Sequence, residues 1–412
     1  MIMVNGEKKK VQVYSEMHTG KWWWKQQSTL PRGATLVPVI CMSDETHLSD
    51  FSGDKKAWPI YLTIGNILSK YRNKPSNHCV ITLALLPIPP KRKNLTSEQQ
   101  ESIDRILQRI LKSILQPLND VSQTGIILDC GDNHKRVCFP RLCSWVADHM
   151  EHIQLLGLSP KSCPVCEVPP DELEHFHERG TYAARDYQAY IEQFEEADNL
   201  RPKAKRQIIN NLKEKGVTGT AEAFSNLGLD ISTLHKPDLL HGIYLGMVKH
   251  ILGLLEGFLK KHKRSARFDE AWVQLKPYPG FYPFHLSYSQ TSHWMGKEMR
   301  NAVKVLCAVL AVALHEPATA AEKAAFTNVQ ECTKAFIDFV HLAQYPSHND
   351  ETLDLMEDFL RTFHKTKEVF RPYRATKQTS REAVQYRAEQ AEALKAAIGQ
   401  MDLTTAARQA LQ

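Results

Sequence analysis

The stretch LVPVICMSDETHLSDFSGDKKAWPIYL, residues 36–62, contains two apolar runs separated by a polar loop. The first run, Leu36–Met42, predicts a strand buried in a hydrophobic core. It ends at Ser43-Asp44, and a second strand-like run, Trp58–Ile64, follows the loop. An unpaired carboxylate at the end of a buried strand is costly, so Asp44 needs a partner, a metal ion or a local capping role.

The composition is typical of a folded protein in a reducing compartment. Hydrophobic residues make up 42% and charged residues 24% of the 412-residue chain, which excludes wholesale disorder. Nine cysteines, an odd number spread thinly, predict free thiols rather than a disulfide framework. The apolar runs are shorter than the ~20 residues of a membrane span, so we expect no membrane. The net charge of +6 is compatible with nucleic acid but does not require it.

The order of elements indicates the fold. Four strand-like runs come first: Thr35–Met42, Trp58–Ile64, Cys79–Ile88 and Gly125–Cys130. Before the fourth, Ser97–Leu118 carries apolar residues at i, i+3, i+4 and i+7, which predicts an amphipathic helix closed by Pro117. We expect a second helix in FPRLCSWVADHM (139–150) and a fifth strand in HIQLLGL (152–158). The order β-β-β-α-β-α-β predicts an antiparallel meander followed by parallel strands.

This order resembles the ribonuclease-H-like fold, an α/β (α+β) class with a mixed five-stranded sheet and flanking helices. Residues 1–159 would form the first part of this core, with all five strands. Residues 160–285 predict a largely helical insertion that contains the motif CPVC, and residues 286–375 would close the core with helices. The Ala/Gln-rich tail, residues 376–412, is predicted to be helical or disordered.

Two strand-end carboxylates, Asp44 and Asp132, form the candidate metal site. In ILDCGDNHKR (127–136), Asp129 lies inside the fourth strand and Asp132 just past its end. If that strand neighbours the first, Asp44 and Asp132 converge. Oxygen ligands suit Mg²⁺ or Mn²⁺, and two such ions can activate a water molecule and stabilise the leaving oxygen of a phosphodiester. The alternative is that Asp44 caps its own loop, SDETHLSD.

Several blocks resemble Plavaka-type transposases, fungal members of the Kyakuja–Dileera–Zisupton superfamily of cut-and-paste DNA transposases. They run in order over roughly residues 14 to 370 and include VICMSDETHLSDFSGDKKAWPIYLTIGNI, GDNHKRVCFPRLCSWVADHMEHIQLLGL, CPVCEVPPDEL, KPDLLHGIYLGMVKHIL and YSQTSHWMGKEMRNAVKVL. The resemblance implies a nuclease and strand transferase of the Asp-Asp-Glu type. Its partners would be transposon ends and target DNA in the nucleus, and it would act as a homo-oligomer.

The resemblance assigns the catalytic carboxylates position by position. Asp44 would be the first and Asp132 the second, while Asp129 fits less well because it lies inside the strand. For the third carboxylate we choose Glu298 in HWMGKE, with Trp294 one turn before it as a supporting residue. Glu256 and Glu270 are the alternatives for this position, and the competing interpretation of Glu298 is a solvated acid on a helix face.

A second candidate metal site contains cysteine. Cys163 and Cys166 in CPVC have the spacing of two thiolate ligands of tetrahedral zinc, and His175 and His177 in ELEHFHERG are close in sequence. A redox CxxC would normally begin a helix, and the prolines that follow this motif argue against that role.

Two further motifs remain open. In PDLLHGIYLG, Asp238 and His241 share a helix face and are similar to a Cys-or-Asp-x-x-His element of related transposases, although Asp238 could simply cap the helix. The tryptophans in KWWWK (21–25) could stack on bases or cover the edge of a core.

Relatives generally carry zinc-finger-like segments N-terminal to this region, so we expect a truncated copy that keeps its catalytic core. The alternative is a catalytically inactive, transposase-derived protein that binds DNA or other proteins.

Overall fold

The computed structural model describes residues 2–4, 7–9, 11–48, 56–88, 95–291 and 294–373. The chain divides into two compact units. Unit 1 comprises Met1–Lys249, Ser292–Leu306 and Thr333–Lys365, and unit 2 comprises His250–Thr291, Cys307–Cys332 and Thr366–Gln412. The predicted tail, residues 376–412, lies outside the described residues.

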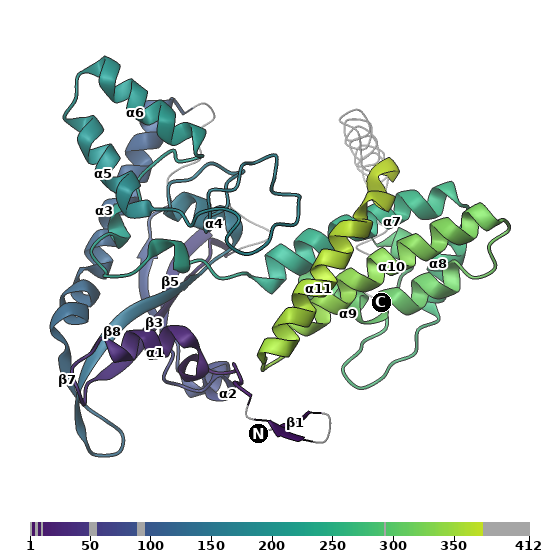
Figure 1. Ribbon diagram of the computed structural model, residues 1–412, viewed down its shortest axis with the longest axis horizontal. Coiled ribbons are helices and arrows are strands. Elements are labelled where there is room, and N and C mark those ends of the chain that lie inside the picture. Colours follow the sequence, from purple (N-terminus) through teal and green to yellow (C-terminus); the bar gives the residue numbers. More distant parts are fainter. Residues whose placement is uncertain are drawn as a thin grey trace, which may run out of the picture. The chain divides into compact units, whose positions relative to one another are not determined.

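A mixed sheet forms the centre of unit 1 (Figure 1). Its strands lie in the order β6–β5–β3–β8–β7, and the two-residue β4 (Thr46–His47) pairs with the start of β5. The bounds are β3 (Thr35–Ser43), β5 (Lys56–Ile64), β6 (Ile81–Leu86), β7 (Ile126–Asp129) and β8 (Lys135–Val146).

The directions of these strands agree with the predicted fold class. Strands β3, β5 and β6 form the expected antiparallel meander, β8 runs parallel to β3, and β7 is antiparallel to β8 at the edge. The predicted α/β class, a mixed five-stranded sheet with flanking helices consistent with a ribonuclease-H-like core, is confirmed.

The two elements after β7 differ from the prediction. The segment predicted as a helix at residues 139–150 is mainly strand β8, and the segment predicted as a fifth strand at residues 152–158 begins as helix α4 (His149–Leu155). Consecutive residues Leu142, Cys143, Ser144 and Trp145 are all buried, so β8 is covered on both faces. Strands of this kind lack an alternating pattern and cannot be told from buried helices by periodicity.

Helix α3 (Ser97–Thr124) packs its apolar face on the sheet. A capping box between Thr96 and Gln99 starts the helix, and Leu107, Leu111 and Leu115 join the core that contains Val39 and Trp145. Pro117 lies inside this helix, which continues to Thr124 beyond the predicted end.

Helix α1 (Lys21–Ser28) contains the three tryptophans and contacts β3. The Gln27 side chain accepts a hydrogen bond from the Leu36 amide (3.0 Å) and donates one to the Ala34 carbonyl (2.8 Å). Trp22 and Trp23 are half-buried, whereas Trp24 is 62% exposed. Two of the three rings therefore cover part of the unit, and base stacking by Trp24 stays a prediction.

The other elements of unit 1 are short or belong to the region after α4. They are β1 (Ile2–Val4), β2 (Glu7–Lys9), α2 (Ser69–Arg72), α5 (Tyr187–Asp198), α6 (Pro202–Glu214), the π-helix η5 (Leu239–Val248) and α11 (Asp350–Thr366). Short 3₁₀ turns connect them: η1 (Met17–Thr19), η2 (Pro75–Asn77), η3 (Glu222–Phe224) and η4 (Ile231–Thr233). Helices α9 (Gly296–Ala313) and α10 (Ala320–Ala343) each contribute residues to both units.

Unit 2 is helical in its described part. Helices α7 (Lys249–Lys261) and α8 (Ser265–Val273) are followed by the 3₁₀ turns η6 (Tyr288–Gln290) and η7 (Lys367–Tyr373). Phe258 and Phe326 make an edge contact at 5.9 Å in its core. Arg264 donates to the carbonyls of His315 and Glu316 and so holds the segment that follows α9.

Among the described residues, one continuous helical stretch, Leu239–Lys261, has the length and hydropathy of a membrane span. The core helix of a soluble protein passes the same test, and five side chains in its α7 part are buried: Ile251, Leu252, Leu255, Phe258 and Leu259.

Candidate active site

Two neighbouring parallel strands are each followed by an aspartate, Asp44 one residue after β3 and Asp148 two residues after β8. The register of β3 and β8 places Met42 beside Val146, and each strand ends within one residue of that pair. If this register is extended by two residues beyond Met42 and Val146, Asp44 lies beside Asp148. The carboxyl ends of adjacent parallel strands, ~4.8 Å apart, therefore present two carboxylates at one edge of the sheet.

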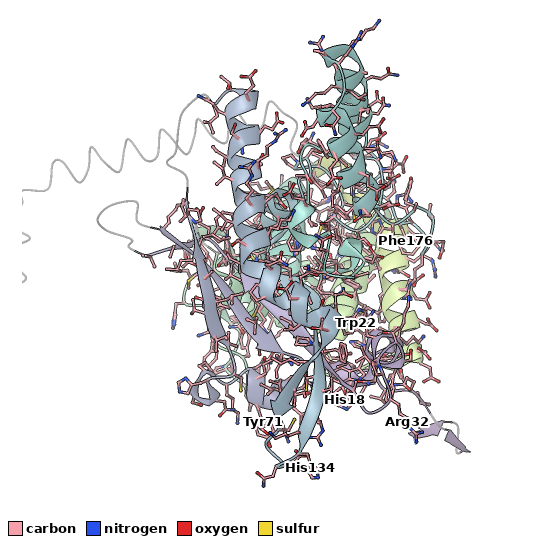
Figure 2. The ribbon with its side chains drawn as sticks, turned by 90° about the vertical axis from the view of Figure 1, so that its left-hand side faces the viewer. His18, Trp22, Arg32, Tyr71, His134 and Phe176 are labelled. Atoms are coloured by element: carbon pink, nitrogen blue, oxygen red, sulfur yellow. The ribbon has the colours of Figure 1, made fainter. Side chains whose placement is uncertain are left out.

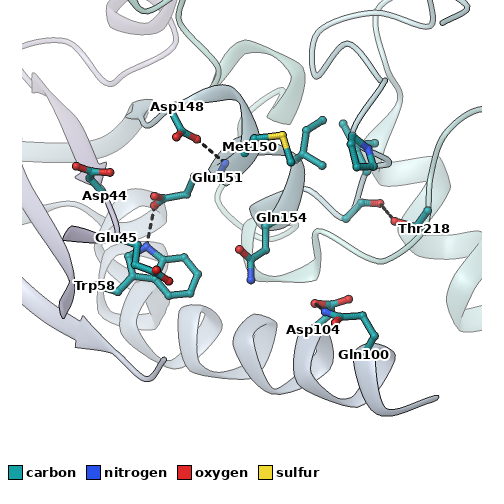
Figure 3. A pocket seen from close by; sticks show the side chains of 14 residues that line it. Asp44, Glu45, Trp58, Gln100, Asp104, Asp148, Met150, Glu151, Gln154 and Thr218 are labelled. Carbon is teal, nitrogen blue, oxygen red and sulfur yellow. Dashed lines mark hydrogen bonds between the residues drawn. The ribbon is translucent and has the colours of Figure 1, made fainter. Parts of the chain in front are cut away.

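A cavity of about 480 Å³ opens at this edge (Figure 3). Asp44 and Glu45 after β3 line it, together with Asp148 and Glu151 around the start of α4. Asp104 of α3 lines its other side. The cavity thus collects five carboxylates from three parts of the sequence.

Glu151 is the buried member of this group, with 8% of its surface exposed. Its Oε1 accepts hydrogen bonds from Trp58 Nε1 (2.9 Å) and from the Ser43 hydroxyl. Trp145 Nε1 in turn donates to Ser43 Oγ (2.8 Å). The Asp148 carboxylate caps α4 by accepting the Glu151 amide (2.7 Å). These bonds fix the ends of β3 and β8 to the first turn of α4.

Negative charge accumulates at this edge. Burial raises the pKa of Glu151, and the charges of Asp148 and Asp44 raise it further, against the hydrogen bonds from Ser43 and Trp58. Lys56 forms an ion pair with Glu45 at the rim. Carboxylates with mutual repulsion and oxygen-only donors fit Mg²⁺ or Mn²⁺.

Asp132 lies at the other end of the strands. The β3–β8 register pairs Cys138 with Thr35, the first residue of β3. Asp132 precedes Cys138 and so lies at the N-terminal end of β3. Asp44, in contrast, follows the C-terminal end of β3. The nine residues of β3 span roughly 30 Å. The predicted convergence of Asp44 and Asp132 is therefore wrong, because the strand before Asp132 is an edge strand and not the neighbour of β3.

Asp132 belongs to the β7–β8 hairpin, whose turn is marked by His134 in Figure 2. Its carboxylate accepts two hydrogen bonds from the Arg136 guanidinium (2.7 and 2.6 Å), which lower the pKa of Asp132 to about 2. Asp129 pairs with Lys135 in the same hairpin. These contacts explain both aspartates as structural residues of a surface turn.

The structure places Glu298 in the first turn of α9, where its Oε2 accepts the Met295 amide (2.9 Å). This is a local cap of the helix, and Glu298 is not among the residues that line the cavity. Trp294 comes just before α9, and its ring is half-buried. Of the two alternatives, Glu256 pairs with Lys260 on α7, and Glu270 accepts from Gln274 at the end of α8.

Asp238 caps the π-helix η5, as the simpler interpretation of its motif predicts. Its carboxylate accepts the amides of Leu240 (2.9 Å) and His241 (2.7 Å). The same carboxylate also contacts His241 Nδ1 (2.6 Å), so the two residues of the motif do interact.

The CPVC thiols lie together, with 3.7 Å between Cys163 Sγ and Cys166 Sγ. His177 is half-buried, and its Nε2 lies 2.9 Å from the Glu172 carbonyl, whereas His175 is exposed. In the described part of the chain, no group of three His, Cys, Asp or Glu side chains is already arranged to hold a metal ion. The predicted zinc ligands are thus only half assembled.

A family model described as Plavaka transposase matches residues 2–255. The chain belongs to the Plavaka transposase family. The matched residues include Asp44, Asp148, the CPVC motif and the Asp238–His241 pair. Glu298 lies beyond the match, so its assignment still rests on the resemblance alone. A search of curated proteins found no match.

The residues that sequence reasoning missed in this Plavaka chain are Asp148 and Glu151. Both lie in the block WVADHMEHIQL, which supported the resemblance to the family but was not searched for site residues. A usable signal was present, since Asp148 three residues before Glu151 has the spacing of a helix N-cap followed by an acidic first turn.

Proposed function

We propose that this Plavaka transposase cleaves DNA phosphodiesters with the help of divalent cations held by Asp44 and Asp148. The supporting observation is that these aspartates lie one and two residues after the ends of two adjacent parallel strands and line one cavity. Membership of a transposase family supports DNA as the substrate. We further propose that the chain joins cleaved transposon ends to target DNA in the nucleus, as an oligomer.

The residues at the cavity suit this chemistry. Asp44 and Asp148 offer exposed or half-buried oxygen atoms, and bound Mg²⁺ or Mn²⁺ would supply activation of water and stabilisation of the leaving oxygen. Glu151 has its Oε1 engaged by Ser43 and Trp58, so we assign it to positioning the aspartates. Glu298 remains the proposed third carboxylate, on the resemblance alone.

The test compares three aspartate variants in metal-dependent nicking of a supercoiled plasmid. Asp44→Asn and Asp148→Asn should each lower the nicking rate at least about a hundredfold, because each removes a charged ligand. Asp132→Asn is the matched control, since it also removes an aspartate that follows a strand. It should retain activity within about threefold.

A binding measurement makes the result independent of activity. Mn²⁺ should raise the thermal unfolding temperature of the parent and of Asp132→Asn, but not that of Asp148→Asn. Loss of nicking and of Mn²⁺ stabilisation in Asp132→Asn, with Asp148→Asn unaffected, would overturn the assignment in favour of the hairpin aspartate. A parent chain that neither nicks DNA nor responds to Mn²⁺ would overturn the proposed function itself.

A further inference from the structure

The CPVC segment is a turn held in place from several sides. Arg185, 3% exposed, donates from Nε to the Cys163 carbonyl (2.6 Å) and from its guanidinium to the Lys215 carbonyl (2.9 Å). The Tyr187 hydroxyl donates to the Pro164 carbonyl (2.8 Å). The turn is therefore preorganised, and the positions of both thiols are fixed before any ligand binds.

Cys163 Sγ accepts two hydrogen bonds. The Val165 amide (3.4 Å) and the Cys166 thiol (3.7 Å) both donate to it. Such bonds stabilise thiolates, the form of cysteine that binds metals.

The distance between the thiols fits a tetrahedral metal ion. Two zinc–sulfur bonds of about 2.3 Å at a tetrahedral angle place the sulfur atoms about 3.8 Å apart. The observed separation is 3.7 Å. The half-site formed by Cys163 and Cys166 thus already has the geometry that Zn²⁺ requires.

His177 is oriented as a ligand. Because a carbonyl oxygen only accepts hydrogen bonds, the contact between His177 Nε2 and the Glu172 carbonyl (2.9 Å) requires a proton on Nε2. The lone pair of the neutral ring is then on Nδ1, and a backbone carbonyl bonded to the other nitrogen is the usual support of a metal-binding histidine.

Tyr182 connects His177 to the CPVC turn. The two rings meet edge to face at 4.9 Å. The residues after Tyr182 pair with the CPVC turn: the Glu167 amide donates to the Ala183 carbonyl (3.0 Å), and Cys166 and Ala184 form an antiparallel bridge. Tyr182 thus contacts His177 and directly precedes the residues that pair with the CPVC turn.

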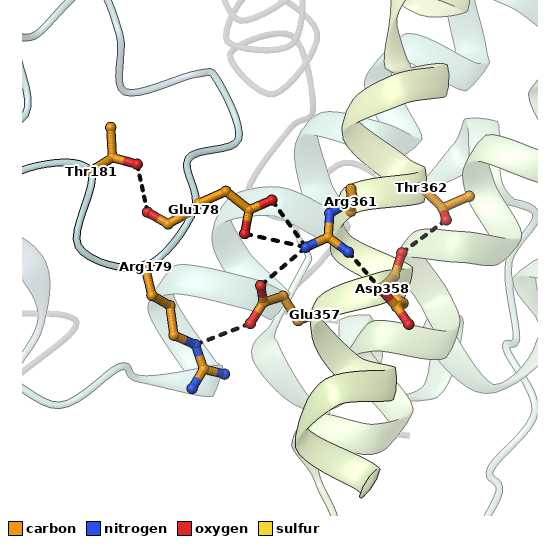
Figure 4. A network of polar contacts seen from close by, with 7 residues as sticks. All are labelled: Glu178, Arg179, Thr181, Glu357, Asp358, Arg361 and Thr362. Atoms are coloured by element: carbon orange, nitrogen blue, oxygen red, sulfur yellow. Dashed lines mark hydrogen bonds and ion pairs between the residues drawn. The ribbon is translucent and has the colours of Figure 1, made fainter. Parts of the chain in front are cut away.

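Neighbours of His177 contact α11, and Figure 4 shows the contacts of Glu178 and Arg179. Arg361 donates to both carboxylate oxygens of Glu178 (3.1 and 3.3 Å), and its guanidinium lies over the Phe176 ring at 5.2 Å. Arg179 pairs with Glu357 (3.0 Å). In this short run, His177 is the residue turned toward Tyr182 while the residues around it contact α11.

We propose that Cys163, Cys166 and His177 bind one Zn²⁺ ion, and that this ion fixes residues 171–182, the segment that contacts α11. Since no three-ligand group is preformed in the described residues, binding brings His177 onto the dithiol and releases the two thiol protons to solvent. The site is separate from the carboxylate cavity and does not depend on the proposed cleavage chemistry.

The experiment titrates the full chain, freed of metal by a chelator under reducing conditions, with Co²⁺ as the spectroscopic probe. We expect a thiolate-to-cobalt charge-transfer absorption that saturates at one Co²⁺ per chain, and its displacement by Zn²⁺. His177→Gln should weaken Co²⁺ binding at least about tenfold, because it removes one ligand. The matched control His175→Gln should bind Co²⁺ like the parent.

Two further measurements keep the result interpretable. Zn²⁺ should slow trypsin cleavage after Arg179 in the parent but not in His177→Gln, which reports on the segment itself. Asp148→Asn should bind Co²⁺ with an unchanged charge-transfer band, which separates this site from the carboxylate cavity. Absence of the band in the parent would overturn the proposal, and equal Co²⁺ affinities of His177→Gln and His175→Gln would overturn the role of His177.

Discussion

Glu151 connects four elements at the edge of the sheet. It lies on α4, and Trp58 of β5 and Ser43 of β3 donate to its carboxylate, while Trp145 of β8 donates to Ser43. Because Asp44 and Asp148 come one and two residues after β3 and β8, the same hydrogen bonds set the position of both aspartates. The buried Glu151 carboxylate, with its Oε1 engaged in this way, orders this edge of the sheet.

Removing this carboxylate should destabilise the fold. Glu151→Ala leaves the Trp58 indole and the Ser43 hydroxyl without their acceptor, and we expect it to lower the free energy of unfolding by about 1–3 kcal/mol. Glu151→Gln keeps an acceptor oxygen and should lose less. Urea denaturation measures both. Gln154→Ala, on the exposed side of the same helix, is the control, and an equal loss there would contradict the argument.

Asp132 and Asp148 show why residue type alone did not identify the site. Each aspartate closely follows a strand, so the sequence pattern of the two is the same. The two aspartates differ because Asp148 follows β8, which lies beside β3, whereas Asp132 follows the edge strand β7. Which strand lies beside β3 depends on long-range pairing. Asp44, which follows the clearest strand in the sequence, was predicted correctly as a residue at a strand end.

At the scale of elements, the error in the sequence reasoning lies in β8 and α4. A strand covered on both faces has no alternation, and a seven-residue helix has few turns in which to show its period. The first three strands and α3 were predictable because their patterns are strong and local. The β7–β8 hairpin was not, since its edge position is decided by the sheet as a whole.

Gly157, which follows α4, holds two segments of the cavity wall together. Its carbonyl accepts the amides of Thr218 (2.8 Å) and Gly219 (2.9 Å), and its φ of 64° is in the left-handed region. A Cβ atom added at Gly157 would lie 2.4 Å from the backbone of Gly219. Only glycine therefore permits this approach.

We expect Gly157→Ala to be more destabilising than Gly33→Ala. Both glycines have a positive φ, so each alanine carries a conformational cost of roughly 1–2 kcal/mol. A methyl group at Gly33 would have no atom within 4 Å, whereas one at Gly157 would force two backbones apart at a further ~1–3 kcal/mol. Chemical denaturation of the two variants gives the comparison, and equal losses would refute the close-contact argument.

At the scale of the whole molecule, element order was enough to predict the α/β class and the mixed sheet. It was not enough to place elements that meet only in three dimensions, such as Asp148 beside Asp44. The family match ends at residue 255, so it does not extend to the C-terminal helices that carry Glu298.

Global stability should fall in mild acid because of a buried histidine pair. His152 is 1% exposed and meets His235 edge to face at 4.4 Å. Burial lowers the pKa of His152 to about 3, with added effects of His235 and His149. The unfolded value is about 6.5, so between these values the unfolded chain binds a proton that the folded chain does not. Stability is therefore complete above pH 6.5 and lost as the pH falls toward 3.

The contribution of His152 should reach about 2 kcal/mol at pH 5. Urea unfolding at pH 7.5 and pH 5.0 measures it, and His152→Gln should remove that part of the pH dependence. His134→Gln, at an exposed histidine of the β7–β8 hairpin, should leave the dependence as in the parent. If both variants lose stability in acid as the parent does, His152 is not the cause.

The pairing of Met42 with Val146 has a consequence for biosynthesis. Strand β3 leaves the ribosome first, and β5, β6 and α3 follow before its parallel partner is made. Until β8 has emerged, one side of β3 is unpaired and Asp44 has no neighbour. A nascent or prematurely terminated chain therefore lacks the carboxylate pair, and under the proposed function a polypeptide released before α4 would not cleave DNA.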